Sequence, residues 1–278
     1  MVGGLRSAAI QLVRRGSREI SWVPDWMGLG NNLYQWLWAY EGVREQRDRR
    51  VLLPEKHALW GEVFPQARRK VLVSRSQVRV FDQRVTPWLQ PDEPSHDAQG
   101  RYSPPLLNEF IEDLLLPGSG LKSTDHFVIN VRRGDYYSVP RYRYQFGMPV
   151  ERYLRVAMER AIASGGAPRV IHMVSDDPDW CRDHLGWLDE IAPVVYPAAG
   201  RTALSDLREV AGAQRLIMTN STFSFWAGYI GACLHGPQHR VIAPAFFRRD
   251  LEQGSSHLLK EWTAVEDVPG GWELADHE

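Results

Sequence analysis

The second half of the chain alternates between two spacings of apolar residues. Short apolar runs of the strand type are each followed by a longer segment in which apolar residues recur every three or four positions, as on one face of a helix. We expect strands at residues 126–131, 169–174, 194–196, 216–219 and 240–243, and helices at 150–163, 178–185, 204–213 and 223–234. Repeated strand–helix units predict a parallel, doubly wound α/β sheet.

The first half shows the same alternation less regularly. Strands are expected at 20–23, 50–53, 70–74 and 78–81, a glycine-rich turn at 28–32, a helix from Leu33, a loop at 86–105 and a helix at 106–116. The run Pro117-Gly118-Ser119-Gly120 ends that last helix and marks a domain boundary. The sequence therefore predicts an α/β protein of two Rossmann-like domains facing a cleft, residues 1–120 and 121–278.

Composition narrows the function classes. The 278 residues are 44% hydrophobic and 24% charged, a composition that allows the chain to form hydrophobic cores. The net charge of -1 provides no positive electrostatic field that would attract a nucleic acid. Two cysteines, Cys181 and Cys233, are too few for a disulfide framework, and the long apolar runs of a membrane span or signal peptide are missing from the pattern. We expect a cytoplasmic protein with no transmembrane segment and no nucleic-acid partner.

The most informative motif is Arg132-Arg133-Gly134-Asp135, which directly follows the apolar strand that ends at Asn130-Val131. Ligands of open α/β sheets bind where strands end, and two guanidiniums there suit a diphosphate because their planar forks match phosphate oxygens. A surface ion-pair cluster is the plain alternative. An adhesive Arg-Gly-Asp tripeptide would require an extracellular loop.

Two further segments join a strand to a helix. Ser175-Asp176-Asp177-Pro178-Asp179 offers a metal-binding pair in Asp177 and Asp179, but acids and proline at a helix start also cap it, and we favour capping. Ser175 and Asp176 remain candidates to face the cleft. Asn220-Ser221-Thr222-Phe223 could cradle a phosphate, cap a helix or, in another compartment, accept a glycan.

Weaker signals complete the picture. Gly28-Leu29-Gly30-Asn31 lacks the third glycine of a dinucleotide fingerprint and could be a plain turn, and Asp206 could lie on a solvated helix face. The nine histidines show no metal-ligand spacing, and no nucleotide-triphosphate loop or serine-hydrolase motif is present. We therefore predict no metal and no cofactor.

Taken in order, these motifs resemble the α-1,2-fucosyltransferases of glycosyltransferase family 11. The family's Gly-Leu-Gly-Asn-Gln-like segment matches Gly28-Leu29-Gly30-Asn31-Asn32. Its His-x-Arg-Arg-Gly-Asp-Tyr hallmark matches Asn130 to Tyr136, and its Asn-Ser-Thr-Phe-Ser-like run matches Asn220 to Ser224; Glu261-Trp262-Thr263 matches a segment near the family's C-terminus. One position departs from the pattern, because the hallmark histidine is Asn130 here.

The resemblance implies a two-domain GT-B-like fold and transfer of L-fucose, with inversion and without a metal, from GDP-fucose to a galactose 2-hydroxyl of a glycan. Residues 121–278 would hold the donor and residues 1–120 the acceptor. Carried over to this chain, the implied site residues are Asn130, Arg132, Arg133 and Asp135 in the hallmark, Asp206, Ser221, Thr222 and Phe223 in the later part of the chain, and Gly30 and Asn31 in the first motif. Ser175 and Asp176 join this set from the sequence pattern described above.

Within this set the resemblance gives several residues distinct roles. Arg132 and Arg133 would neutralise the β-phosphate, Ser221 and Thr222 would hold phosphate oxygens, and Asp206 would bind the guanine. Asp135 is a candidate general base or a group that orients an arginine.

Three rival functions stay open at this point. A different GDP-sugar or linkage would keep the same motifs. A nucleotide- or glycan-binding module without turnover is kept open by Asn130. A metal-dependent enzyme using Asp177 and Asp179 would lose activity in a chelator.

Overall fold

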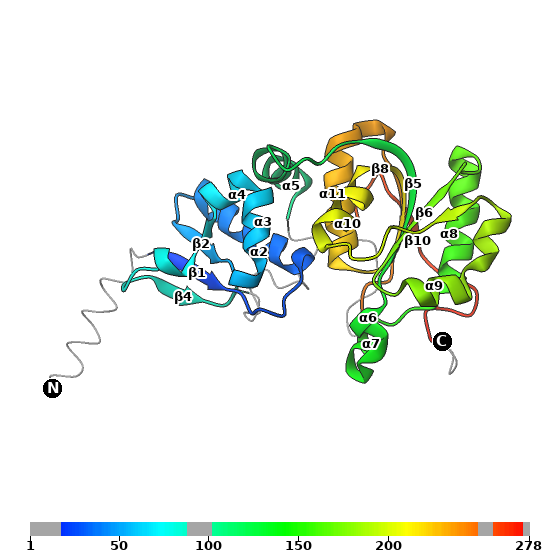
Figure 1. Cartoon of the computed structure of the whole chain (residues 1–278), viewed down its shortest axis with the longest axis horizontal. Helices are drawn as coiled ribbons and strands as arrows, with labels where there is room; N and C mark the ends of the chain where they lie inside the picture. The colour runs from blue at the N-terminus through cyan, green and yellow to red at the C-terminus, as the bar shows by residue number, and fades with distance from the viewer. Residues whose placement is uncertain (1–17, 88–101, 250–257, 275–278) are drawn as a thin grey trace. The chain divides into compact units, whose positions relative to one another are not determined.

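The protein consists of two compact units, Met1–Gly120 and Leu121–Glu278, which are described separately below. A computed structural model describes residues 18–87, 102–249 and 258–274 (Figure 1). Most of the loop expected at 86–105 lies outside these residues. Both units contain a parallel sheet with helices packed on it, so the predicted α/β class is confirmed.

Unit 1 (Met1–Gly120) is built on a four-stranded parallel sheet of order β3-β2-β1-β4. Its strands are β1 Glu19–Trp22, β2 Arg49–Leu52, β3 Leu72–Val73 and β4 Gln83–Val85. Its helices are α2 Leu29–Arg44, α3 Ala58–Val63, α4 Pro65–Lys70 and α5 Pro104–Phe110, the last continued by a π-helical turn, Ile111–Leu115. The helix α2 supplies the core, with Leu33, Trp36 and Leu37 fully buried.

Two expectations for this unit were wrong. The helix α2 begins at Leu29, with Gly28 as its N-cap, so the expected turn at 28–32 is mostly the first turn of the helix. Residues 78–81 are not a strand, since Val80 and Phe81 are 89% and 60% exposed and the edge strand follows at Gln83–Val85. A strand on the sheet edge needs little burial, so β4 can have a polar sequence. A search for apolar runs therefore does not find it.

Unit 2 (Leu121–Glu278) is built on a six-stranded parallel sheet of order β10-β9-β8-β5-β6-β7. The strands are β5 Thr124–Val131, β6 Ile171–Ser175, β7 Val194–Val195, β8 Ala213–Met218, β9 Arg240–Pro244 and β10 Thr263–Val265. The helices are α6 Gly134–Ser138, α7 Pro140–Phe146, α8 Val150–Gly165, α9 Pro178–His184, α10 Ala203–Gly212 and α11 Thr222–His235. The sequence pattern missed β10 and the short helices α6 and α7.

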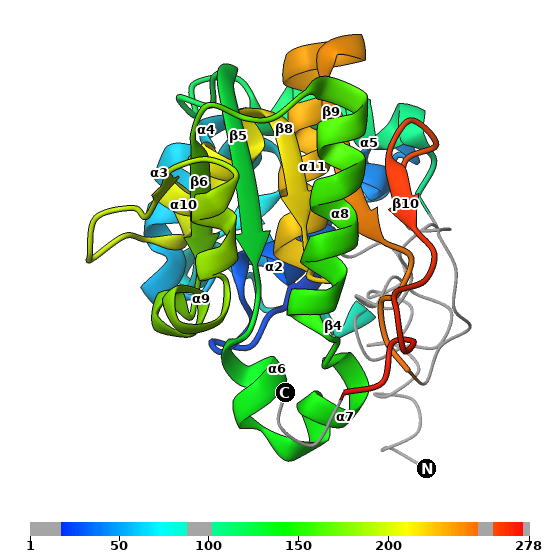
Figure 2. The same ribbon diagram turned by 90° about the vertical axis from the view of Figure 1, so that its right-hand side faces the viewer.

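Helices cover both faces of this sheet. In Figures 1 and 2, α8 and α9 lie on one side, α10 and α11 lie on the other, and α6 and α7 follow the arrowhead of β5. Alternate residues of β5 serve the two faces, as the period of a strand requires. Phe127, Ile129 and Val131 join the core around α8, whereas the side chain of Asn130 bonds to α11.

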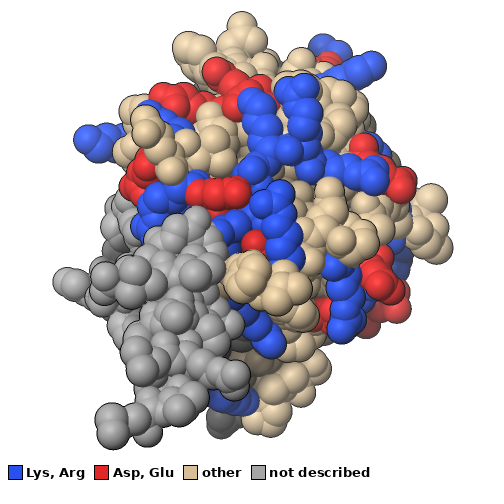
Figure 3. Space-filling model, turned by 90° about the vertical axis from the view of Figure 1, so that its left-hand side faces the viewer, with Lys and Arg blue, Asp and Glu red and all other residues tan. Residues whose placement is uncertain are grey.

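Acidic side chains accompany many of the basic ones. Figure 3 shows a face on which Lys and Arg gather, with Asp and Glu lying among them. In unit 1, Arg18 pairs with Asp82 at 2.5 Å and Arg47 with Glu19 at 3.0 Å. These cations therefore have counter-charges within their own unit. Over the described residues, none of the helices combines the length and apolar character required to span a bilayer.

Candidate functional site

A pocket of about 200 Å³ opens at the carboxyl ends of β5 and β6, beside the N-termini of α10 and α11. This edge of a parallel sheet is where open α/β proteins bind ligands. Seven residues predicted from the sequence line it: Asn130, Arg132, Ser175, Asp176, Asp206, Ser221 and Phe223. Val131, Val174 and Ala203 complete the lining. The topology thus collects residues that lie far apart in the sequence.

Arg132 is held between two carboxylates. Its guanidinium bonds to Asp135 and lies 2.8 Å from the Asp176 carboxylate, and its backbone N–H donates to the Thr219 hydroxyl at 2.8 Å. Burial lowers the pKa of Arg132, but the carboxylates of Asp176 and Asp135 outweigh it and raise that pKa. The side chain keeps 37% of its surface exposed. Arg132 is therefore a fixed cation that can still contact a ligand.

Gly134 is required by this arrangement. Its φ of 26° lies on the positive side, and a Cβ atom added there would stand 2.4 Å from the Asp176 Oδ2 atom that pairs with Arg132. A distance that short cannot occur without movement of the carboxylate. The glycine of the motif thus makes room for the ion pair beside it.

Arg133 has different surroundings. Its guanidinium lies 3.9 Å from the ring centroid of Tyr137 and 3.7 Å from that of Trp180, and its Nε is 3.4 Å from Asp177. Burial lowers the pKa of Arg133, against the opposing effects of Tyr137 and Asp177. Only its backbone N–H reaches the pocket side, where it donates to Asp176 at 2.7 Å. The side chain is 9% exposed and does not line the pocket.

Buried hydrogen bonds tie β5 to the N-terminus of α11. The Asn130 amide donates to the Val174 carbonyl at 3.0 Å and accepts from the Ser224 hydroxyl at 2.6 Å. Since the Ser224 hydroxyl donates its one proton to Asn130, the Ser221 hydroxyl, 2.7 Å away, must be the donor in its hydrogen bond with Ser224. Ser221 also caps α11 by accepting from the Ser224 N–H at 3.1 Å. The Ser221 proton is thus already committed inside the protein.

Asp177 and Asp179 flank the first residue of α9, Pro178. Asp177 is the N-cap and accepts from the Trp180 N–H at 3.3 Å, so the preferred capping interpretation is confirmed for this residue. Asp179 lies on the surface, where it pairs with Arg182 at 2.6 Å. The Ser175 hydroxyl accepts from the Asp177 N–H at 3.0 Å. Asp177 and Asp179 therefore have separate partners and do not form a paired site.

Asp206 belongs to the first turn of α10 and has a counter-ion that the sequence did not reveal. The Nε of Arg201 donates to its carboxylate at 2.6 Å. A capping box formed by Thr202 and Ser205 begins the helix and fixes the direction in which this turn points. Thr222 is the first residue of α11 and is not part of the pocket lining.

Gly30 and Asn31 lie in the first turn of α2 in unit 1. The side chain of Asn32 donates to the carbonyl oxygens of Met27 and Gly28, which holds the loop before the helix. The Oδ1 atom of Asn31 is buried and has no hydrogen-bond partner among the described residues.

Comparison with known proteins decides the family. The model of glycosyl transferase family 11 matches residues 106–266, more than half of the chain. The chain belongs to glycosyl transferase family 11. The matched segment contains every residue that lines the pocket, so the family 11 region and the pocket coincide.

Several curated family relatives are mammalian. Galactoside alpha-(1,2)-fucosyltransferase 1 of Sus scrofa is 30% identical over 174 residues, which are 61% of this chain and 45% of that protein. The proteins of the same name from Leontopithecus chrysomelas and Saimiri sciureus are each 29% identical over 168 residues, 59% of this chain. These alignments cover 45% and 44% of the two relatives. The chain therefore spans about half the length of the curated relatives it matches.

Proposed function

We propose that this family 11 chain transfers L-fucose from GDP-fucose to the 2-hydroxyl of a galactose on a glycan. The observation that carries the proposal is Arg132, a paired but ligand-accessible guanidinium in the pocket at the sheet edge. The named relatives support the sugar, the acceptor and the linkage.

The chemistry needs charge stabilisation on the leaving group. The acceptor oxygen attacks the anomeric carbon of fucose from the side opposite to GDP, the bond from that carbon to the β-phosphate oxygen breaks, and the acceptor loses its proton. Negative charge grows on the β-phosphate as the bond breaks, and a fixed cation aimed at that charge lowers the barrier. We assign this role to Arg132, without a metal ion and without any cofactor besides the donor substrate.

The N-terminus of α11 supplies further stabilisation. Its first two backbone N–H groups, those of Thr222 and Phe223, have no partner within the helix, and a helix N-terminus favours an anion. Because the Ser221 proton is committed to Ser224, these N–H groups replace the Ser221 hydroxyl as our proposed phosphate donors. Asp206 would accept from the guanine, with Arg201 orienting its carboxylate. Arg133 would act through packing that positions the motif.

Asp135 is proposed as an orienting group. Its carboxylate already bonds to Arg132, which leaves it occupied rather than available as a base. We further propose a GT-B-like division of labour, in which unit 2 holds the GDP-sugar and unit 1, through Gly30 and Asn31, faces the acceptor.

A transfer assay tests the proposal. The purified chain is incubated with GDP-fucose and an acceptor that ends in galactose, in a chelator, and the product linkage is read by NMR. Arg132→Ala is compared with Arg155→Ala, an arginine of the outer α8 surface paired with Glu151. We expect product with wild type and Arg155→Ala, and a loss of at least a hundredfold with Arg132→Ala.

Other outcomes separate the rivals. GDP binding without transfer or donor hydrolysis would leave only a binding module. Turnover of another GDP-sugar, or a different linkage in the product, would replace the donor or acceptor we propose. Activity lost in the chelator would overturn metal independence, and full activity in Arg132→Ala would remove the role of that residue.

A further inference from the structure

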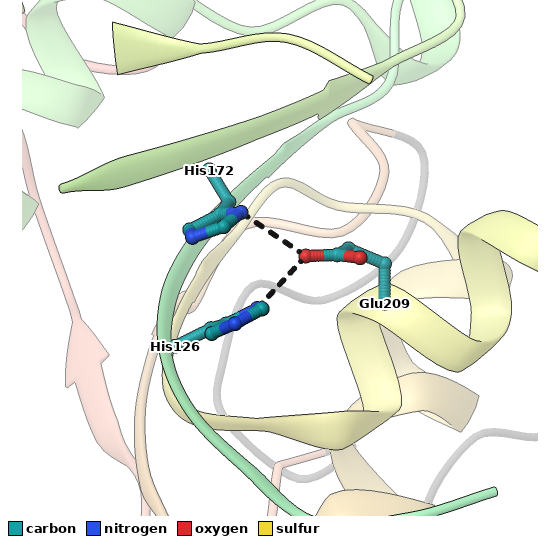
Figure 4. A group of neighbouring side chains, drawn as sticks. All are labelled: His126, His172 and Glu209. Atoms are coloured by element: carbon teal, nitrogen blue, oxygen red, sulfur yellow. Dashed lines mark hydrogen bonds and ion pairs between the residues drawn. The ribbon is translucent and has the colours of Figure 1, made fainter. Parts of the chain in front are cut away.

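Unit 2 contains a second cluster of chemically active side chains at the opposite, amino-terminal end of its sheet. His126 of β5 and His172 of β6 direct their Nδ1 atoms at one carboxylate oxygen of Glu209 on α10, at 3.0 and 3.2 Å (Figure 4). The two imidazoles lie 4.0 Å apart between centroids and within 10° of parallel. The proposed transfer reaction uses none of these groups.

The strand register brings the histidines together. Val128 pairs with His172 across β5 and β6, so His126 and His172 project from the same face two positions apart along the ladder. That face is covered by α10, from which Glu209 reaches them. Spacing along the sequence could not reveal the group, because its members lie on three separate elements.

We propose that His126, His172 and Glu209 bind a divalent transition-metal ion such as Zn²⁺. Two imidazoles and one carboxylate are a known zinc ligand set, and imidazole selects such ions over Mg²⁺ and Ca²⁺. The ligand atoms of the three residues all lie within 4.8 Å of one another. Tetrahedral zinc with bonds of 2.0–2.1 Å places ligand atoms about 3.3 Å apart, close to both observed nitrogen–oxygen distances.

Binding requires small local changes that the site permits. Each histidine coordinates as a neutral ring through its Nδ1 lone pair, so a ring that donates an Nδ1 proton to Glu209 must carry that proton on Nε2 instead. The rings must also turn, because parallel planes do not aim two lone pairs at one point; torsion about the bond to the ring has broad minima. His126 and His172 are 36% and 27% exposed, which leaves room for rotation and for water as a fourth ligand.

The surrounding charge favours a cation. Glu209 carries the negative charge at the centre of the group, and Asp125 lies close enough to His172 to interact electrostatically with it. An ion of charge two would replace hydrogen bonds between partly exposed groups with coordinate bonds, and it would join two strands to the helix that covers them.

Zinc titration of the full chain tests this site. Protein freed of metal with a chelator is titrated with Zn²⁺ by calorimetry as wild type, His172→Asn and Glu209→Gln. The control is His184→Asn, which changes an exposed histidine stacked on Trp180 outside the cluster. We expect one saturable Zn²⁺ in wild type and control, bound at least about tenfold more weakly by the two cluster variants.

Two readouts guard against misfolded variants. Circular dichroism in the chelator checks that each variant keeps its fold, and wild type alone is titrated with Co²⁺, whose visible absorption reports nitrogen and oxygen ligands in a four-coordinate site. Equal Zn²⁺ affinity in all four proteins would overturn the proposal, as would a wild type without saturable binding or a Co²⁺ spectrum of the hydrated ion.

Discussion

The two ends of the unit 2 sheet differ in the kind of charge they hold. At the carboxyl ends, Arg132 and Arg133 lie among aspartates, whereas at the amino ends His126 stacks on His172 and His235 on His239. A guanidinium stays charged at every physiological pH, while an imidazole gains or loses its charge near neutrality. One end is thus suited to a permanent phosphate contact, and the other to binding that depends on protonation.

The same contrast appears within the arginine pair. Arg132 pairs with two carboxylates and keeps part of its guanidinium accessible, whereas Arg133 is enclosed by two aromatic rings. The two residues lie between the end of β5 and the start of α6, where Arg132 lines the pocket and Arg133 contacts Trp180 of α9 and its N-cap Asp177. Two arginines of one motif can therefore have different roles, one in contact with the pocket and one in packing. The predictions below test these contrasts.

The largest expected effect comes from Arg132→Lys. Lysine keeps the charge but loses the planar fork that contacts two carboxylates and that we propose to contact the phosphate, so we expect transfer to fall by about a hundredfold. The measurement is kcat/KM with GDP-fucose. A loss below threefold would mean that charge alone matters at this end of the sheet.

Arg133→Met should act on stability instead. Methionine keeps the apolar stem but removes the charge held between Tyr137 and Trp180, and we expect the free energy of unfolding to fall by about 2 kcal/mol. Urea denaturation measures it, and GDP affinity should change far less than in Arg132→Lys. The reverse result, with stability kept and GDP affinity lost, would place Arg133 in contact with the ligand.

The histidine end should make stability depend on pH. Burial, assisted by His235, lowers the pKa of His239 to about 4, and both ring nitrogens are buried without a hydrogen-bond partner among the described residues. Below the ordinary value of about 6.5 the unfolded chain binds the proton more readily, so stability rises with pH between about 4 and 6.5 and falls as acid is added. From pH 7 to pH 5.5 we expect a loss of about 1 kcal/mol.

Urea denaturation at the two pH values, with His239→Leu beside His184→Asn, isolates this effect. The leucine variant should lose about 1 kcal/mol less than wild type on acidification, and the control should behave as wild type. A pH dependence that is the same in all three proteins would assign it to other groups.

The smallest expected effect belongs to Arg201→Ala. Removing the counter-ion of Asp206 leaves the aspartate in place but free to reorient, and partly exposed ion pairs contribute little. We expect GDP affinity to fall by about two- to fivefold, measured by calorimetry. A loss of a hundredfold or more would show that Arg201 itself contacts the nucleotide.

The sequence predicted those features of the fold that depend on residues close together along the chain. The apolar run 126–131 and the change from apolar to charged residues at Arg132 were enough to identify β5 and the place where it ends. A central strand is buried, and burial requires a run of apolar residues that is visible in the sequence. The Asp177 cap was predictable for the same reason, since a helix start needs acceptors within three residues.

Contacts between side chains on different helices and strands could not be predicted from the sequence. The sequence could not show which way Arg133 turns, because that direction is decided by Trp180 on another element. Nor could it show that Ser224 takes the Asn130 oxygen, or that Arg201 faces Asp206. The histidine cluster escaped the spacing rules because strand register, and not sequence distance, brings its members together.

The helix α10 carries Asp206 at the pocket and Glu209 at the histidine cluster, three residues apart and so within one turn. The proposed ion and the proposed nucleotide would both contact this one turn, so we expect a coupling free energy between the two sites. By thermodynamic linkage, any factor by which an ion at Glu209 changes the affinity for a nucleotide at Asp206 is the factor by which the nucleotide changes the affinity for the ion. If both proposed ligands bind, a Zn²⁺ titration with and without GDP measures the coupling that this turn of helix transmits.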